Sequence, residues 1–124
     1  MKNNSQKEYS FTIEGEPASK ANSRKIVMFG KRPALIKSDK ARNYLKMFEA
    51  QCEPLEEMFE GDVGVDITIY YASRRPDLDE SVILDAMEKK IYKNDRQVKE
   101  KNIRWGLDKE NPRAEIRVFQ PCLQ

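Results

Sequence analysis

The chain of 124 residues contains no histidine. Without an imidazole group, the sequence excludes Ser-His and Cys-His nucleophilic catalysis, histidine-based zinc sites and histidine proton shuttles. Any hydrolytic chemistry must therefore depend on carboxylates, lysines, tyrosines and a metal ion. The two cysteines, Cys52 and Cys122, lie far apart and match neither a disulfide framework nor a zinc site, so we interpret both as reduced thiols.

Long apolar runs are also missing, which predicts that the chain has no transmembrane helix and no membrane partner. The first residues, MKNNSQKEYS, lack the apolar stretch of a signal peptide, so we expect a cytoplasmic protein. The length is typical of one domain, expected to span residues 1–124 with flexible ends at 1–8 and 120–124. Hydrophobic residues make up 39% of the chain and charged residues 35%, which predicts a core of modest size.

The net charge of +2 says little about partners, but the charges are unevenly distributed. Residues 49–62 contain six acids and no base. Residues 18–46 contain one acid, Asp39, and nine basic residues: Lys20, Arg24, Lys25, Lys31, Arg32, Lys37, Lys40, Arg42 and Lys46. Such a basic segment suits a phosphate backbone, although a solvated loop and helix face would explain it equally well.

The spacing of apolar residues predicts a mixed α+β domain. Ser38 is a suitable N-cap for a first helix that Pro54 ends or kinks, and a second helix is expected to begin near Asp79 or Ser81. In chain order, the expected elements are a strand at 9–13, a hairpin at 25–36 with a basic tip, a helix from 39, a strand at 65–71, a helix ending near 89–90, and strands at 97–105 and 114–118.

Three acidic residues stand out, namely Asp77 and Asp79 in SRRPDLDESVILDAM and Asp95 in IYKNDRQV. The first two lie between the strand at 65–71 and the second helix, and the third follows that helix. A strand end and a helix exit can bring three carboxylates together, and such carboxylates repel one another unless a cation holds them. Mg²⁺ prefers oxygen ligands of this kind. We therefore hypothesise metal-assisted hydrolysis; the alternative is a set of solvated loop acids, with Asp79 capping a helix.

The stretch PDLDESVILDAMEKKIYKNDRQV resembles the RusA family of Holliday junction resolvases. The expected order of elements also fits that family from Tyr9 to the end of the chain. The matching positions are Asp77-Leu78-Asp79, Asp85-Ala86-Met87, Tyr92 and Asp95-Arg96-Gln97-Val98.

This resemblance implies a homodimer that binds four-way DNA junctions and uses Mg²⁺ or Mn²⁺, with no small-molecule cofactor, to cut two opposing strands symmetrically in recombination and repair. By the same resemblance, Asp77, Asp79 and Asp95 are the catalytic, metal-binding acids. It also implies a nucleoid-associated protein of bacterial or phage origin. The first turn of the second helix, Glu80–Ile83, lacks the lysine that the family often carries there. A junction-binding protein with weak or no catalysis is therefore one alternative, and a nuclease for flaps or other branched DNA is another.

The candidate DNA-binding residues come from the basic segment and from the approach to the acidic pair. Met28 and Phe29, near the hairpin tip, could act as apolar wedges at the junction crossover, although a place in the core or in a subunit interface explains them at least as well. The candidates are Lys20, Arg24, Lys25, Lys31, Arg32, Arg74 and Arg75.

Overall fold

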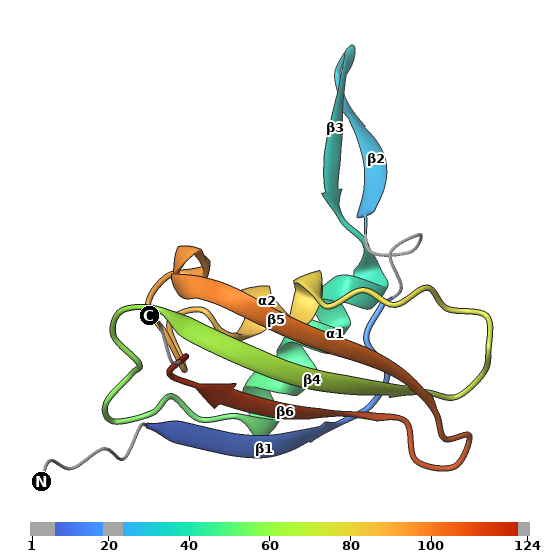
Figure 1. Ribbon diagram of the computed structural model, residues 1–124. Coiled ribbons are helices and arrows are strands. Elements are labelled where there is room, and N and C mark those ends of the chain that lie inside the picture. The colour runs from blue at the N-terminus through green and yellow to red at the C-terminus, as the bar shows by residue number, and fades with distance from the viewer. Residues whose placement is uncertain (1–6, 19–23, 122–124) are drawn as a thin grey trace, which may run out of the picture.

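A computed structural model describes residues 7–18 and 24–121 as a mixed four-stranded sheet with two helices on one face and a separate hairpin (Figure 1). The strand order is β1-β6-β4-β5; β4 and β5 are parallel, and the other neighbouring pairs are antiparallel. The expected α+β domain with a mixed sheet and two helices is confirmed. The elements are β1 (Glu8–Glu14), β2 (Arg24–Phe29), β3 (Arg32–Lys37), α1 (Asp39–Gln51), β4 (Val63–Tyr71), α2 (Ser81–Met87), the 3-10 helix η2 (Asp95–Gln97), β5 (Val98–Leu107) and β6 (Arg113–Phe119).

The core lies between the sheet and the two helices. In β4, Val65, Ile67, Ile69 and Tyr71 alternate with more exposed residues and are fully buried. This period of two places every second side chain on the helix-covered face, as the sequence predicts. In β6, Ala114, Ile116 and Val118 face the core, as expected.

Helix α1 begins where its capping residue predicts. The Ser38 hydroxyl accepts a hydrogen bond from Ala41 N at 3.1 Å, which satisfies one of the free amides of the first turn. Tyr44 and Phe48 lie on its buried face with Ala41, at the spacing of one side of a helix. The helix ends at Gln51, before Pro54 can interrupt it.

The connection between β4 and β5 differs in detail from expectation. Because the two strands are parallel, the chain must cross back over the sheet, and α2 is part of this crossover. Helix α2 begins at Ser81, one of the two expected starts, with Glu80 as N-cap, but it ends at Met87, before the expected end near 89–90. The short helix η2 was not expected; it follows a capping box formed by Asn94 and Gln97.

The ends of the described chain are joined by hydrogen bonds. Lys7 N donates to Gln120 Oε1 at 3.0 Å, and Gln120 N donates to Lys7 O at 3.2 Å. These two residues lie within the stretches 1–8 and 120–124, whose flexibility stays a prediction. Cys52 is a buried free thiol, whereas Cys122 lies outside the described residues. No helix within the described ranges is long and apolar enough to span a membrane.

Candidate active site

The loop between β4 and α2, residues 72–80, carries Asp77 and Asp79. Asp77 is exposed, whereas Asp79 is only 6% exposed. The Tyr71 hydroxyl donates to Asp77 O at 3.2 Å and accepts from Asp79 N at 3.4 Å. A buried side chain at the end of β4 therefore fixes the backbone on which both carboxylates are mounted.

Trp105 is a second anchor for this loop. Its indole Nε1 donates to Pro76 O at 3.2 Å, and its ring stacks on that of Tyr71, with the ring centroids 5.9 Å apart. From its position in the chain, we interpreted Trp105 only as a residue of the sheet core. Its role depends on the parallel pairing of β4 and β5, which places the two aromatic rings on adjacent strands.

Asp79 also shapes the start of α2. Its Oδ1 accepts a hydrogen bond from Ser81 N at 3.0 Å, so the carboxylate lies against the first residue of the helix. A carboxylate in this position is stabilised by the free amides of a helix N-terminus. The local turn thus explains why an acidic side chain is tolerated at a buried position.

Glu16 is a carboxylate beside this loop that sequence reasoning missed. Its Oε1 accepts from Ala72 N at 2.9 Å, and its Oε2 lies 3.9 Å from Lys40 Nζ. Gly15, in the same turn, adopts the left-handed conformation (φ 107°), and a Cβ there would collide with Met47. An acid in the turn EGEP is unremarkable in sequence, and only the fold brings it to the end of β4.

Several carboxylates surround the Tyr71 hydroxyl. Burial, reinforced by the charges of Asp79, Glu16 and Glu80, raises the pKa of Tyr71 to about 12, even though the hydrogen bond from Asp79 N lowers it. The hydroxyl therefore stays protonated at neutral pH and remains a donor to Asp77 O. Lys101, on β5, donates a hydrogen bond from its Nζ to Glu80 Oε2 at 2.8 Å. The positive charge of Lys101 offsets part of the negative charge of these carboxylates.

Asp95 lies elsewhere in the fold. It begins η2, just before β5, and the neighbouring Gln97 donates to the carbonyls of Phe59 and Gly61, close to the start of β4. The loop with Asp77 leaves the other end of β4, a nine-residue strand about 30 Å long. In Figure 1 the loop leaves β4 at the right, whereas β5 begins at the left. Because β4 and β5 run in the same direction, the loop that follows β4 and the segment that precedes β5 lie at opposite ends of this strand pair.

The oxygen donors in this part of the molecule are of the kind that Mg²⁺ prefers, but one chain does not gather them. Among residues 7–18 and 24–121, no three acidic or cysteine side chains form a group that could hold a metal ion. Asp77 and Asp79 share one loop, and Asp95 does not join them. Their roles as catalytic acids and metal ligands stay predictions.

Most of the candidate DNA-binding residues are solvent-exposed. Arg24, Lys25, Lys31 and Arg32 lie on the β2–β3 hairpin, and Arg74 and Arg75 lie in the loop with Asp77. Lys25 Nζ is 3.3 Å from Asp39 Oδ1, and this hydrogen-bonded ammonium lowers the pKa of Asp39. Lys20 lies outside the described residues.

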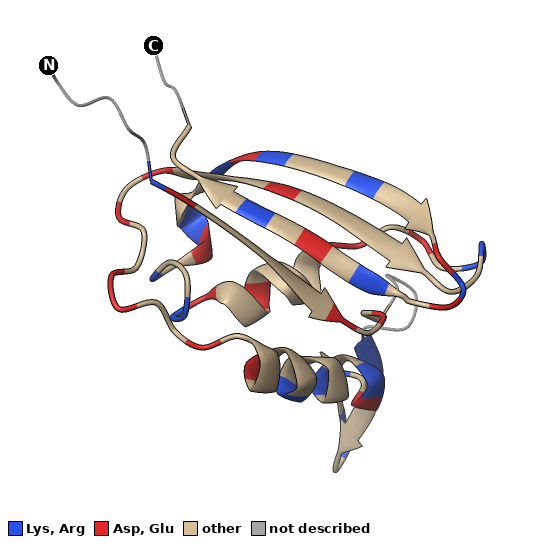
Figure 2. Cartoon of the chain, turned by 90° about the horizontal axis from the view of Figure 1, so that it is seen from below, with Lys and Arg blue, Asp and Glu red and all other residues tan. Residues whose placement is uncertain are grey.

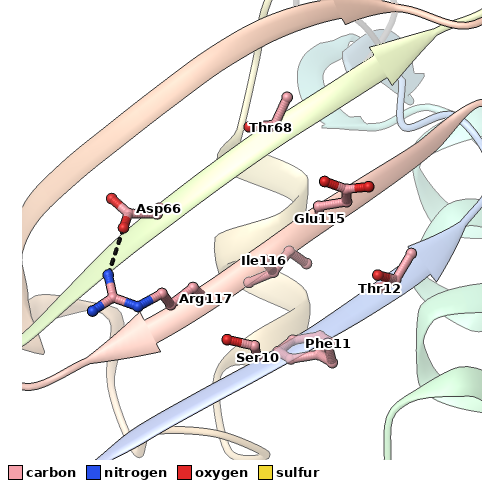
Figure 3. Close-up of a pocket in the computed structure, with 8 residues that line it drawn as sticks. All are labelled: Ser10, Phe11, Thr12, Asp66, Thr68, Glu115, Ile116 and Arg117. Atoms are coloured by element: carbon pink, nitrogen blue, oxygen red, sulfur yellow. Dashed lines mark hydrogen bonds and ion pairs between the residues drawn. The ribbon is translucent and has the colours of Figure 1, made fainter.

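The open face of the sheet has a hollow of its own, which Figure 3 shows between β1, β6 and β4. Acidic and basic residues alternate along β6 (Figure 2). Arg117 lies 2.6 Å from Asp66 and 2.8 Å from Glu8, and Asn102 donates to the other oxygen of Asp66 at 2.7 Å. Because these charged groups satisfy one another across the strands, this hollow is a weaker candidate for the reaction site than the loop with Asp77.

One comparison with known proteins gives a match. The family model described as Endodeoxyribonuclease RusA matches residues 14–119, which include both helices, the hairpin and the strands β4, β5 and β6, but only the last residue of β1. The chain has no match among curated proteins. The matched range contains the acidic residues near the Tyr71 hydroxyl, namely Glu16, Asp77, Asp79 and Glu80. It also contains Asp95, at the start of η2.

Proposed function

Because the chain belongs to the RusA endodeoxyribonuclease family, we propose that it resolves four-way DNA junctions by paired, symmetric cuts in recombination and repair. The family match is the observation that carries this proposal. The loop after β4 supports it, since this loop presents an exposed carboxylate, Asp77, beside two exposed arginines, Arg74 and Arg75. Arginines in this position suit the phosphates on either side of a scissile bond.

In this proposal, residues of the chain hold and orient the DNA backbone. Arg74 and Arg75 bind phosphate oxygens of the DNA. Tyr71 and Trp105 hold the loop backbone in place through their hydrogen bonds while the DNA is bound. A positioned loop matters because a small displacement of a reacting group can cost a large part of the rate. We assign cleavage to the neighbourhood of Asp77, which is the exposed member of the acidic pair.

We also propose Mg²⁺ as cofactor, replaceable by Mn²⁺, with Asp77, Asp79 and Asp95 as ligands. Such an ion supplies a nucleophilic water and neutralises charge in phosphodiester hydrolysis. A single chain does not assemble this ligand set, so binding of the ion needs a measurement separate from cleavage. Calorimetric titration of the protein with Mg²⁺, with and without a junction, provides it.

The proposed assembly is a homodimer, because two identical sites related by a two-fold axis match the approximate symmetry of a four-way junction. The proposed place of action is the nucleoid of the cytoplasm. Sedimentation equilibrium of the protein alone and with a junction tests the assembly, and a monomer in both samples would contradict it.

The first prediction concerns Asp77. With a synthetic four-way junction and Mg²⁺, Asp77→Asn should reduce cleavage by about a hundredfold or more while junction binding persists, because the change removes a charge and no volume. Gel assays of cleavage and of binding measure the two effects. The matched control is Asp62→Asn, which alters an exposed acid just before β4, at the end of that strand away from the loop. Equal cleavage by Asp77→Asn and the unaltered chain would remove Asp77 from the reaction.

Two other functions use the same surface. The separation of Asp95 from Asp77, and the missing lysine in Glu80–Ile83, favour a junction-binding protein with weak or no catalysis. Tight binding without cleavage in either Mg²⁺ or Mn²⁺ would support that function. A nuclease for flaps would instead cut a flap faster than a four-way junction, and both faster than a linear duplex.

A further inference from the structure

The β2–β3 hairpin projects from the body of the protein (Figure 1), and it carries exposed apolar side chains on one face. Ile26 is 72% exposed, Leu35 66% and Met28 58%. These side chains share one face, because Ile26 pairs with Leu35 and Met28 pairs with Pro33 across the two strands. The tip adds Phe29, which is 62% exposed on the opposite face.

This exposure is costly for a free protein. A two-stranded hairpin is marginally stable by itself in water, and contiguous apolar surface on a soluble protein marks a site of interaction. None of the described hairpin residues belongs to the buried cluster that forms the core. The hairpin thus contributes little to the stability of the body, and its apolar face is available to a partner.

The rim of this face is positively charged. Residues 24–37 contain five basic residues and no acid. Lys25 and Lys37, near the root, pair with Asp39 and Asp85 of the body. Lys31 and Arg32, at the tip, make no ion pair with any part of the chain that the structure describes.

We propose that the hairpin is a DNA-binding arm whose apolar face packs on sugars and unstacked bases at the branch point, while Lys31 and Arg32 bind the flanking phosphates. This inference rests on the proposed function. Proteins that kink or open DNA combine apolar side chains, which press on base steps, with basic residues on the backbone. A two-stranded ribbon is also narrow enough to enter a DNA groove.

A second copy of the chain fits this face less well. Among the described residues, the exposed large hydrophobic side chains are those four of the hairpin and Leu107. The extended apolar surface that another copy could offer is therefore the hairpin itself, and pairing two hairpins would bring their cations together. Branched DNA offers apolar sugars and base faces edged by phosphates, which complements both features of the arm.

The test compares arm variants for binding to a four-way junction without divalent cations, so that cleavage plays no part. Ile26→Thr/Leu35→Thr removes two of the three large exposed apolar side chains of this face, the third being Met28, while keeping residues that favour strands. We expect this variant to bind the junction about tenfold more weakly, with an unchanged dependence on salt, because it loses no phosphate contact. A 2-aminopurine base at the branch point should brighten on binding of the unaltered chain and stay dim with the variant.

Lys31→Ala/Arg32→Ala should instead weaken binding and lower the slope of log affinity against log salt by about two, since about one unit is lost with each phosphate contact. The matched apolar control is Leu107→Thr, at an exposed position on the sheet, which should leave the affinity unchanged. Melting temperatures within a few degrees of the unaltered chain show that the variants are folded.

Each of the following results would overturn the proposal. Equal affinity and equal 2-aminopurine signal for Ile26→Thr/Leu35→Thr would show that the face does not meet DNA. A fall in molecular mass by sedimentation, with junction affinity unchanged, would assign the face to a second copy. If the unaltered chain binds no branched DNA, the proposed function fails and the arm fails with it, whereas tight binding by the unaltered chain and by every arm variant overturns the arm alone.

Discussion

At the scale of single residues, Tyr44 holds a hydroxyl group that lacks a hydrogen-bond partner. The side chain is 2% exposed, and its Oη is the one buried side-chain oxygen or nitrogen in the described ranges without a partner. Burial raises the pKa of this phenol. An unsatisfied buried hydroxyl costs on the order of 1 kcal/mol or more, so this group lowers the stability of the fold.

We therefore expect Tyr44→Phe to raise the free energy of unfolding by about 1 kcal/mol. Tyr92→Phe is the matched control, because the Tyr92 hydroxyl donates to Leu84 O at 2.8 Å, and its removal should lower stability by about the same amount. Urea unfolding followed by circular dichroism measures both. A loss of stability in both variants would mean that Tyr44 Oη has a partner, such as a buried water.

At the scale of elements, the strands and helix α1 followed from sequence, because alternation and capping are local signals. Tyr71 and Ser38 are good examples: one ends a period of two, and the other caps α1 through a contact three residues away. The partner of each strand is not a local property. The parallel pairing of β4 with β5 separates Asp95 from Asp77 and brings Trp105 to Pro76. The pairing of both β1 and β4 with β6 brings Glu16 to Ala72, and no spacing along the chain could indicate either contact.

The end of α2 gives a prediction at this scale. Lys89 follows the C-cap Glu88 and has a positive φ of 70°, a conformation that costs most residues about 1 kcal/mol and costs glycine little. Lys89→Gly should therefore raise the free energy of unfolding by about 0.5–1 kcal/mol. Lys93→Gly, at another exposed position with an ordinary φ, should lower it, and thermal unfolding of both variants decides the matter. Destabilisation by Lys89→Gly would show that the lysine side chain adds more to the free energy of unfolding than its positive φ takes away.

At the scale of the whole molecule, charge is divided between separate regions. The hairpin is basic, the connection between α1 and β4 is acidic, and charges of both signs neutralise each other across the open face of the sheet. A small net charge thus conceals a strongly positive arm, and this is why composition alone left the basic segment open to two interpretations. Association with DNA through one such region should be fast and steeply dependent on salt.

The dependence of stability on alkaline pH is a property of the whole core. Burial raises the pKa of Tyr44, Tyr71 and Tyr92 above the ordinary value of 10, and that of Tyr71 lies at about 12. In each case the folded state holds the proton more tightly than the unfolded state, so the contribution to stability is complete below pH 10 and is lost as the pH rises from 10 towards 12 and beyond. Urea unfolding between pH 8 and pH 11.5 should show a free energy that falls above pH 10, and tyrosinate absorbance should appear together with unfolding. Ionisation of all five tyrosines near pH 10 in a protein that is still folded would show that these hydroxyls are open to water.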